Sequence, residues 1–235
     1  MDMVKNKLRP LAVASHRRSG THLLLENLAA NLQGAELKKS HDFPERLIGE
    51  HGNECDIAFV VRNPFDTLFS LWRWWETGKS SNMRIKKELQ AFTFADFIEG
   101  KCGPLFGFRP YHFMGRDHLE CWRGMFYDPI QFWNDHTQAF LETGCAVVSY
   151  EHLRNNPREA VAHICKRYGL DRARTFNPVT AKVGHAPTVS NVGYSLGLFQ
   201  DAGVARVLDV CGNLMMRLGY QVEDRSLAFK LEPIQ

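Results

Sequence analysis

The stretch Leu11-Ala-Val-Ala-Ser-His-Arg-Arg-Ser-Gly-Thr-His-Leu-Leu-Leu25 takes the chain from an apolar run, through two arginines and small residues, into an apolar helix pattern. The same plan returns in Asp56-Ile-Ala-Phe-Val-Val-Arg-Asn-Pro-Phe-Asp-Thr-Leu-Phe-Ser70. Where a buried strand turns into a helix, unpaired backbone N–H groups and the positive end of the helix dipole hold anions well. Two such turns indicate a ligand that carries phosphate groups at two separate places.

Short apolar runs and helical patterns alternate along the chain. We predict buried strands, from runs of apolar and small residues, at 11–15, 35–38, 57–61 and 146–150. We predict helices at 20–32, 64–75, 157–168 and 202–218. The last helix carries one apolar stripe, made of Val204, Val207, Leu208, Cys211, Leu214, Met215 and Leu218. This alternation predicts an α/β fold, a parallel β-sheet flanked by helices, with ligands at the carboxyl ends of the strands.

The composition limits the classes of protein to consider. The chain has 235 residues, 44% of them hydrophobic and 23% charged, and a net charge of +3. We expect one domain over residues 1–235, and so small a charge does not indicate nucleic acid as a partner. The cysteines form no C-x-x-C pair, so we expect no metal site and no disulfide framework. Without an apolar membrane-span window or a signal-peptide pattern, we expect a cytoplasmic protein.

The middle of the chain is crowded with aromatic residues, namely Phe92, Phe94, Phe97, Phe106, Phe108, Tyr111, Phe113, Trp122, Phe126, Tyr127, Phe132 and Trp133. We interpret residues from about 80 to about 140 as a helical insertion, laid over the sheet, that forms an acceptor pocket or lid. The alternative is that the rings build the core of a helical cap. Three histidines of this region, His112, His118 and His136, are either a second acid–base group or ordinary structural residues.

The first turn has the chemistry of a phosphate loop. Gly20 lets the backbone approach a ligand, Ser19 and Thr21 offer hydroxyl groups, and Arg18 can donate two N–H bonds to phosphate oxygens. The lysine of the G-x-x-x-x-G-K-[ST] loop is absent, which argues against a P-loop phosphotransferase. A plain helix start with exposed arginines is the alternative interpretation.

The second turn reads as a well-formed helix start. Asn63 is a good N-cap, Pro64 suits the first helical position, and Asp66 complements the helix dipole. Arg62 ends the strand and Ser70 lies one turn beyond Asp66, so we expect the two to meet at one phosphate. The alternative is that Arg62 pairs only with Asp66 and that Ser70 is a surface hydroxyl.

Together these segments resemble the sulfotransferases that use 3′-phosphoadenosine 5′-phosphosulfate (PAPS). Arg18-Ser-Gly-Thr-His22 is similar to their 5′-phosphosulfate loop, K/R-S-G-T/S-T/S. Arg62-Asn-Pro-Phe-Asp66 with Ser70 is similar to R-N-P-x-D-x-x-x-S, whose arginine and serine hold the 3′-phosphate. Leu37-Lys-Lys-Ser-His41 resembles the strand-end K-[ST]-H, and Tyr150-Glu-His-Leu153 with Asn156-Pro157 resembles Y-E-x-L…N-P.

The resemblance implies sulfuryl transfer from PAPS to a hydroxyl or amine, in a P-loop-nucleotide-kinase-like architecture. It makes His41 the general base and gives Lys39 and Arg18 catalytic charges. Cofactor contacts are implied for Arg17, Arg18, Ser19, Gly20, Thr21, His22, Arg62, Ser70 and Tyr150. The acceptor is expected to be a small molecule, a glycan or a lipid, with a homodimer left open and no metal required.

The chain departs from the family pattern in three places. Arg18 stands where lysine is usual, and His22 stands where a hydroxyl residue is usual. We leave open whether His22 is an additional donor to the sulfonate or a helix-capping residue. The C-terminal R-K-G-x-x-G-x-W segment has no clear counterpart, and we assign Lys182 to the 3′-phosphate only from its place in the chain. Two other hypotheses stay open: a phosphotransferase or nucleotide kinase, and a non-catalytic nucleotide-binding module.

Overall fold

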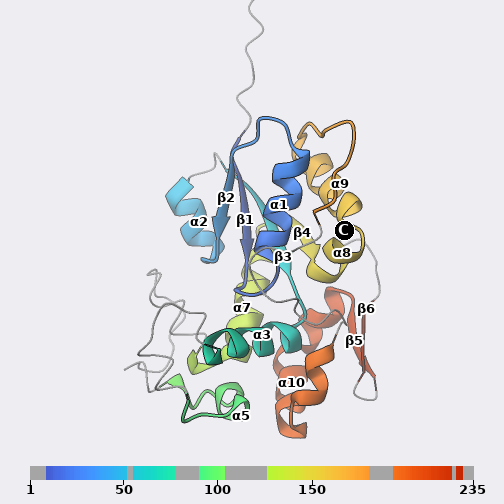
Figure 1. Ribbon diagram of the computed structural model, residues 1–235. Coiled ribbons are helices and arrows are strands. Elements are labelled where there is room, and N and C mark those ends of the chain that lie inside the picture. The colour runs from blue at the N-terminus through green and yellow to red at the C-terminus, as the bar shows by residue number, and fades with distance from the viewer. Residues whose placement is uncertain are drawn as a thin grey trace, which may run out of the picture.

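The computed structural model describes residues 9–51, 55–77, 90–103, 126–179, 193–223 and 226–229. Its centre is a parallel sheet in the order β2-β1-β3-β4 (Figure 1). The strands are β1 (Leu11–Ser15), β2 (Leu37–Ser40), β3 (Asp56–Val61) and β4 (Ala146–Ser149). The predicted α/β class and parallel sheet are confirmed. Strand β2 lies two residues further along the chain than predicted, so it carries Lys39 and ends directly before His41.

The register aligns the carboxyl ends of the four strands. Ala14 pairs with Ser40, Ser15 with Val60, and Val61 with Ser149. From β1 the chain crosses to β2 on one side of the sheet, whereas from β3 it eventually reaches β4 on the other side. The two turns described above therefore leave the sheet at its topological switch point, where open α/β sheets bind ligands.

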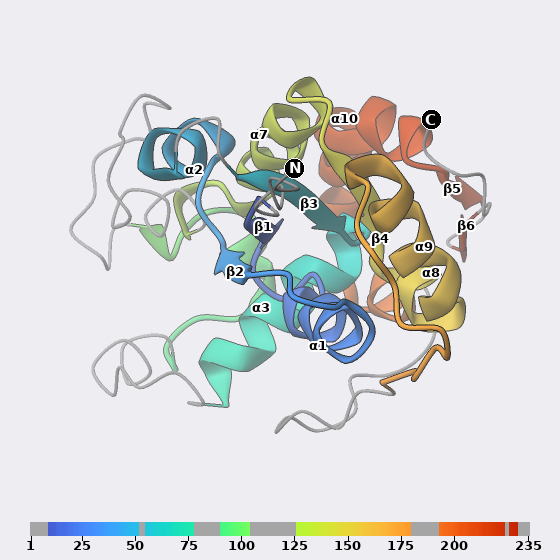
Figure 2. The same ribbon diagram turned by 90° about the horizontal axis from the view of Figure 1, so that it is seen from above.

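Helices cover both faces of the sheet because successive strand residues point to opposite sides. Leu11 and Val13 pack on one face against α1 (Thr21–Asn31), α8 (Tyr150–Asn155) and α9 (Pro157–Tyr168). Ala12 and Ala14 pack on the other face, whose core includes residues of α2 (Pro44–His51), α3 (Pro64–Glu76), α5 (Phe94–Ile98), α7 (Pro129–Glu142) and α10 (Asp201–Arg217). Figure 2 shows α1 and α9 on the side of the sheet opposite to α7 and α10.

Several elements were not expected from the sequence. Helices α2 and α8 are short, the 3-10 helix η3 spans Tyr194–Leu198, and β5 (Tyr220–Glu223) pairs antiparallel with β6 (Ser226–Phe229). Helix α10 confirms the helix predicted at 202–218. Its apolar stripe is narrower than predicted, because Leu208 remains 38% exposed while Val207 and Cys211 are fully buried.

The aromatic residues that the structure describes in the middle region mostly fill the core. Phe97, Phe126, Phe132 and Trp133 are all at most 2% exposed. Phe132 and Trp133 lie on α7, a helix of 14 residues at the end of the segment interpreted above as a helical insertion. These rings therefore follow the alternative interpretation, the core of a helical layer. Phe106, Phe108, Tyr111, Phe113 and Trp122 lie outside the described residues, so the acceptor pocket or lid stays a prediction.

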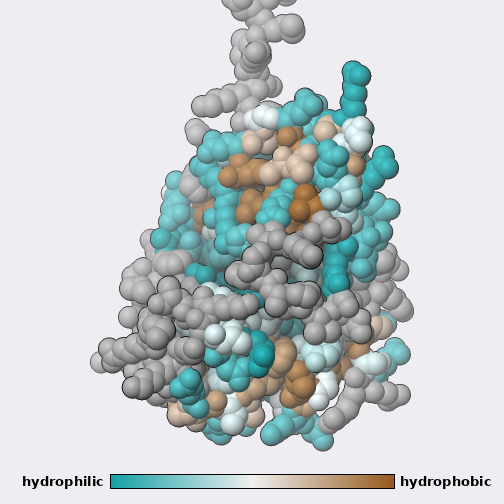
Figure 3. All heavy atoms as spheres, in the orientation of Figure 1, coloured by the Kyte–Doolittle hydropathy of each residue, from teal (hydrophilic) through white to brown (hydrophobic). Residues whose placement is uncertain are grey.

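The surface of the described residues is mainly hydrophilic on the face drawn in Figure 3, with smaller hydrophobic groups among the polar ones. The large hydrophobic side chains that are exposed are Ile48, Tyr194, Leu198, Leu208 and Met216. Within the described ranges, no helix has both the length and the apolar character needed to cross a membrane.

Asp66 connects the start of α3 to the segment that leads into η3. The Asn63 side chain caps α3 by accepting the N–H of Asp66, and its amide donates to Asp66 Oδ2 at 2.8 Å. The same carboxylate accepts the backbone N–H groups of Gly193, at 3.0 Å, and Ser195, at 3.1 Å. Because Asp66 is 2% exposed, these bonds are formed away from solvent. One carboxylate thus holds two segments that are distant in sequence.

We predict that Asp66→Ala lowers the free energy of unfolding by about 3 kcal/mol, because it leaves buried N–H groups without their acceptor. Urea unfolding followed by circular dichroism measures this loss. Glu50→Ala is the control, since it removes only an exposed ion pair with Arg46 and is expected to cost less than about 1 kcal/mol. Equal, small losses in the two variants would contradict this role of Asp66.

Candidate functional site

The first turn has a backbone that suits an anion-binding loop. Arg18 and Gly20 both have positive φ angles, 71° and 105°, and Gly20 is the N-cap of α1. A Cβ atom at Gly20 would collide with the ring of Tyr150, which packs directly against the loop. Glycine is therefore required here both by the backbone conformation and by the neighbouring ring. The loop is closed by the Ser19 N–H, which donates to the carbonyl of His16 at 3.2 Å.

Hydroxyl groups connect the first turn to its surroundings. Ser15 and Thr21 share a hydrogen bond between their side-chain oxygens, which joins the two ends of the loop. Ser19 Oγ lies 3.5 Å from Thr67 Oγ1 of α3, and both residues are fully buried. The hydroxyl of Ser19 therefore faces the second turn.

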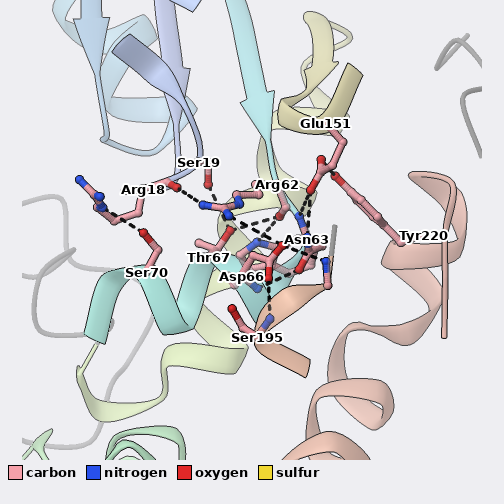
Figure 4. A network of polar contacts seen from close by, with 12 residues as sticks. Arg18, Ser19, Arg62, Asn63, Asp66, Thr67, Ser70, Glu151, Ser195 and Tyr220 are labelled. Atoms are coloured by element: carbon pink, nitrogen blue, oxygen red, sulfur yellow. Dashed lines mark hydrogen bonds and ion pairs between the residues drawn. The ribbon is translucent and has the colours of Figure 1, made fainter. Parts of the chain in front are cut away.

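Arg18 and Arg62 bring the two turns together, as Figure 4 shows. Arg18 Nε donates to Ser70 Oγ at 3.2 Å, and Arg62 Nη1 donates to the carbonyl of Arg18 at 3.4 Å. Burial and the nearby Arg62 guanidinium both lower the pKa of Arg18. Two guanidinium groups held close together repel each other, and an anion bound between them relieves that repulsion.

Arg62 is buried at the carboxyl end of β3, where it is 6% exposed. Its guanidinium carbon lies 4.7 Å from the centre of the Tyr150 ring, and one terminal nitrogen lies 3.7 Å from Asp66 Oδ2. Its Nε is buried and has no hydrogen-bond partner among the described residues. A buried guanidinium with an unused donor is suited to a further acceptor, such as a phosphate oxygen.

A second carboxylate, that of Glu151, is close enough to Arg62 to interact with its charge. Glu151 accepts a hydrogen bond from the Asn63 side chain at 2.9 Å and another from the Tyr220 hydroxyl at 2.6 Å (Figure 4). Burial raises the pKa of Glu151, and these donors and the Arg62 charge oppose that rise. Sequence reasoning quoted Glu151 in a motif but gave it no role, and it missed Tyr220. The only local signal was an acidic residue in the first turn after a strand.

His41 lies at the end of β2 with its ring directed at the first turn. Its Nδ1 is 3.0 Å from the carbonyl oxygen of Ser15. A carbonyl only accepts, so Nδ1 carries the proton and Nε2 keeps its lone pair. Burial, followed by the charges of Arg17 and Lys39, lowers the pKa of His41 to about 3. The imidazole is therefore neutral at physiological pH, as a general base must be.

Lys39 and His22 form a pair at the exposed edge of the site. Lys39 Nζ lies 3.0 Å from His22 Nε2. Because an ammonium group only donates, His22 accepts through Nε2. Burial, and then the charge of Arg17, lower the pKa of Lys39. His22, whose role the sequence left open, thus contacts a lysine of β2.

Two predicted site residues remain, Arg17 and Lys182. The charge of Arg17, which lies in the first turn, lowers the pKa values of His16, Lys39 and His41. Lys182 lies outside the described residues, as do His112 and His118, whereas His136 is fully buried in the core. Among the described residues, no group of acidic, histidine or cysteine side chains is arranged to hold a metal ion.

Buried histidines predict acid sensitivity. Burial lowers the pKa of His16 to about 4 and that of His41 to about 3, and it holds the pKa of His136 well below its usual range. The unfolded chain binds these protons at about pH 6.5, so stability is lost as the pH falls below that value. We expect each histidine to cost up to about 2 kcal/mol between pH 7 and pH 5. Urea unfolding at pH 7, 6 and 5 measures this, and a midpoint independent of pH would refute it.

The fold of this chain is similar to that of a solved sulfotransferase structure. A solved structure with a similar fold is that of mouse sulfotransferase SULT7A1 complexed with PAP. The match has a TM-score of 0.55 and 14% sequence identity, and it covers 88% of this chain and 84% of that chain. This likeness establishes a common fold. No curated protein sequence matches the chain.

A protein-family model matches more than half of the chain. The sulfotransferase domain model matches residues 39–182, which is more than half of the chain and begins at Lys39, just before the predicted base. The matched segment includes the second turn and the Tyr150 ring, and the similar solved structure has the same α/β architecture. The chain belongs to the sulfotransferase family.

Proposed function

We propose that the protein transfers a sulfuryl group from PAPS to a hydroxyl or amine of a small-molecule, glycan or lipid acceptor. Family membership supports sulfuryl transfer as the reaction class. The observation that carries the choice of donor is the junction of the two turns, where Arg18, Ser70 and Arg62 are linked by hydrogen bonds. This junction offers separate cationic donors for two phosphate groups of one nucleotide.

The residues of the junction fit an anionic nucleotide. Among the described residues, Nε of Arg62 is buried and has no hydrogen-bond partner. Arg18 forms no ion pair with any of these residues and donates a hydrogen bond to Ser70. Ser70 offers a hydroxyl to the same region. In this proposal the loop from Arg17 to His22 holds the 5′-phosphosulfate, while Arg62 and Ser70 hold the 3′-phosphate. Lys182 is proposed as a further ligand of the 3′-phosphate.

The proposed chemistry divides between a base and a set of cations. The bound donor supplies a sulfuryl group activated by its bond to the 5′-phosphate. His41 Nε2 accepts the proton of the acceptor hydroxyl while the acceptor oxygen bonds to sulfur and the bond from sulfur to the phosphate oxygen breaks. Arg18 and Lys39 stabilise the negative charge that develops on the departing phosphate. The leaving group is adenosine 3′,5′-bisphosphate.

The first experiment is calorimetric titration of the protein with adenosine 3′,5′-bisphosphate, with AMP, and with ATP and Mg²⁺. The proposal expects the bisphosphate to bind most tightly and without metal. A preference for ATP with Mg²⁺ would favour the phosphotransferase hypothesis. Tight bisphosphate binding without transfer from PAPS to any hydroxyl or amine acceptor would favour the non-catalytic binding module.

We predict that Arg62→Lys weakens adenosine 3′,5′-bisphosphate about tenfold, because a lysine keeps the charge and loses the forked donor geometry. AMP, which lacks the 3′-phosphate, is expected to change by less than about threefold. Arg73→Lys is the matched control, since Arg73 lies on α3 with its side chain 55% exposed. Equal weakening of both nucleotides by the Arg62 variant would remove the 3′-phosphate assignment.

We predict that His41→Ala lowers kcat by about a hundredfold or more, since general-base catalysis contributes at least that much. The affinity for adenosine 3′,5′-bisphosphate is expected to stay nearly the same. Transfer of label from PAPS to the acceptor, followed under saturating donor, measures the loss. Wild-type turnover in the variant would show that another group removes the proton.

A further inference from the structure

Two further imidazoles are buried directly behind His41. His16 and His136 are 1% and 0% exposed, and their ring centroids lie 5.8 Å apart with the rings nearly perpendicular. His16 follows β1, whereas His136 comes from the middle of α7. Neither ring has a part in the chemistry proposed above, although the charge of His16 lowers the pKa of both His41 and His136.

The surroundings of His136 would suit an apolar ring better than an imidazole. Its ring centroid lies between 4.9 and 5.8 Å from those of four phenylalanines, Phe43, Phe59, Phe132 and Phe140. Neither of its nitrogens reaches hydrogen-bond geometry with a described residue. An unsatisfied buried polar group destabilises the folded protein, so phenylalanine at this position is expected to give a more stable protein. An imidazole kept at such a cost indicates a role other than stability.

The neighbours of His136 show what that role involves. The backbone carbonyls of His41 and Asp42 face its ring and favour its protonated form, and Phe43 packs edge-on against it. These three residues form the connection between β2 and α2, and the first of them is the proposed base. Helix α7 itself is fixed in the core, because Ile130, Phe132 and Trp133 are fully buried. His136 therefore lies between a helix buried in the core and the short segment that carries His41.

We propose that His136 is a positioning residue for His41: its buried imidazole supports the backbone at 41–43 and so fixes the direction in which Nε2 of His41 points. The kinetic part of this inference rests on the proposed function. In the protein without nucleotide, the ring of His41 should also occupy one orientation, with the proton on Nδ1.

The test compares His136→Phe with His136→Asn, which keeps a polar group that can donate to the facing carbonyls. His163→Phe is the matched control, because His163 is an exposed residue of α9 on the opposite face of the sheet. We expect His136→Phe to fold at least as stably as the wild type and to lower kcat about tenfold, with the KM for PAPS within about twofold. His136→Asn should recover part of the lost kcat, and His163→Phe should leave kcat unchanged.

Nuclear magnetic resonance of ¹⁵N-labelled histidine rings decides the inference independently of activity. In the wild type, His41 is expected to show the single tautomer protonated at Nδ1, and in His136→Phe a mixture of ring states. Should His136→Phe fail to fold, His136→Leu gives the same reading, because it also removes both ring nitrogens. His41 signals identical to those of the wild type would overturn the proposal. Failure of the wild type to use PAPS would contradict the proposed function alone, since the ring signals of His41 would still test the role of His136.

Discussion

The arrangement around the candidate site depends on one constraint, the burial of the positive charge of Arg62. A guanidinium removed from water needs compensation by negative charge and hydrogen bonds, or the protein is strongly destabilised. Asp66 and Glu151 supply that charge from α3 and α8. Both carboxylates then need donors of their own, which come from Asn63, from Tyr220 of β5 and from the backbone before and within η3. One buried cation thus organises segments from four parts of the chain.

The same constraint shapes the side of Arg62 that faces a ligand. The carbonyl of Arg62 accepts the indole N–H of Trp133, so α7 fixes the backbone while Tyr150 packs on the guanidinium. Nη1 reaches across to the first turn, and Nε stays without a partner among the described residues. The protein compensates the charge of this cation internally and leaves Nε as a directed donor for a ligand. That division favours selective recognition of one phosphate over general attraction of anions.

The sequence predicted the parts of this structure that follow from local patterns. The buried strands, the caps of α3 and the two turns depend on residues close together in the chain, and parallel topology then brings Arg18, His41 and Arg62 to one edge. The contacts of Asp66 with residues 193 and 195, and of Glu151 with Tyr220, have no such signal, because they join residues distant in sequence. The interpretation of the middle region as a pocket or lid was wrong for Phe132 and Trp133, which are buried in the core. The sequence around an aromatic residue does not distinguish a place in a core from a place in a pocket.

The electrostatics of the site connect these features to the proposed chemistry. Burial, together with the charges of Arg17 and Lys39, keeps His41 neutral, and burial has the same effect on His16 and His136. An anion bound at the first turn would offset the positive charges that disfavour protonation of His41. The base would then gain proton affinity only when the donor is in place and the acceptor proton has to be removed. In the proposed mechanism, repelling cations and neutral imidazoles make the site weakly basic without a nucleotide and more strongly basic with one, which would couple nucleotide binding to proton removal.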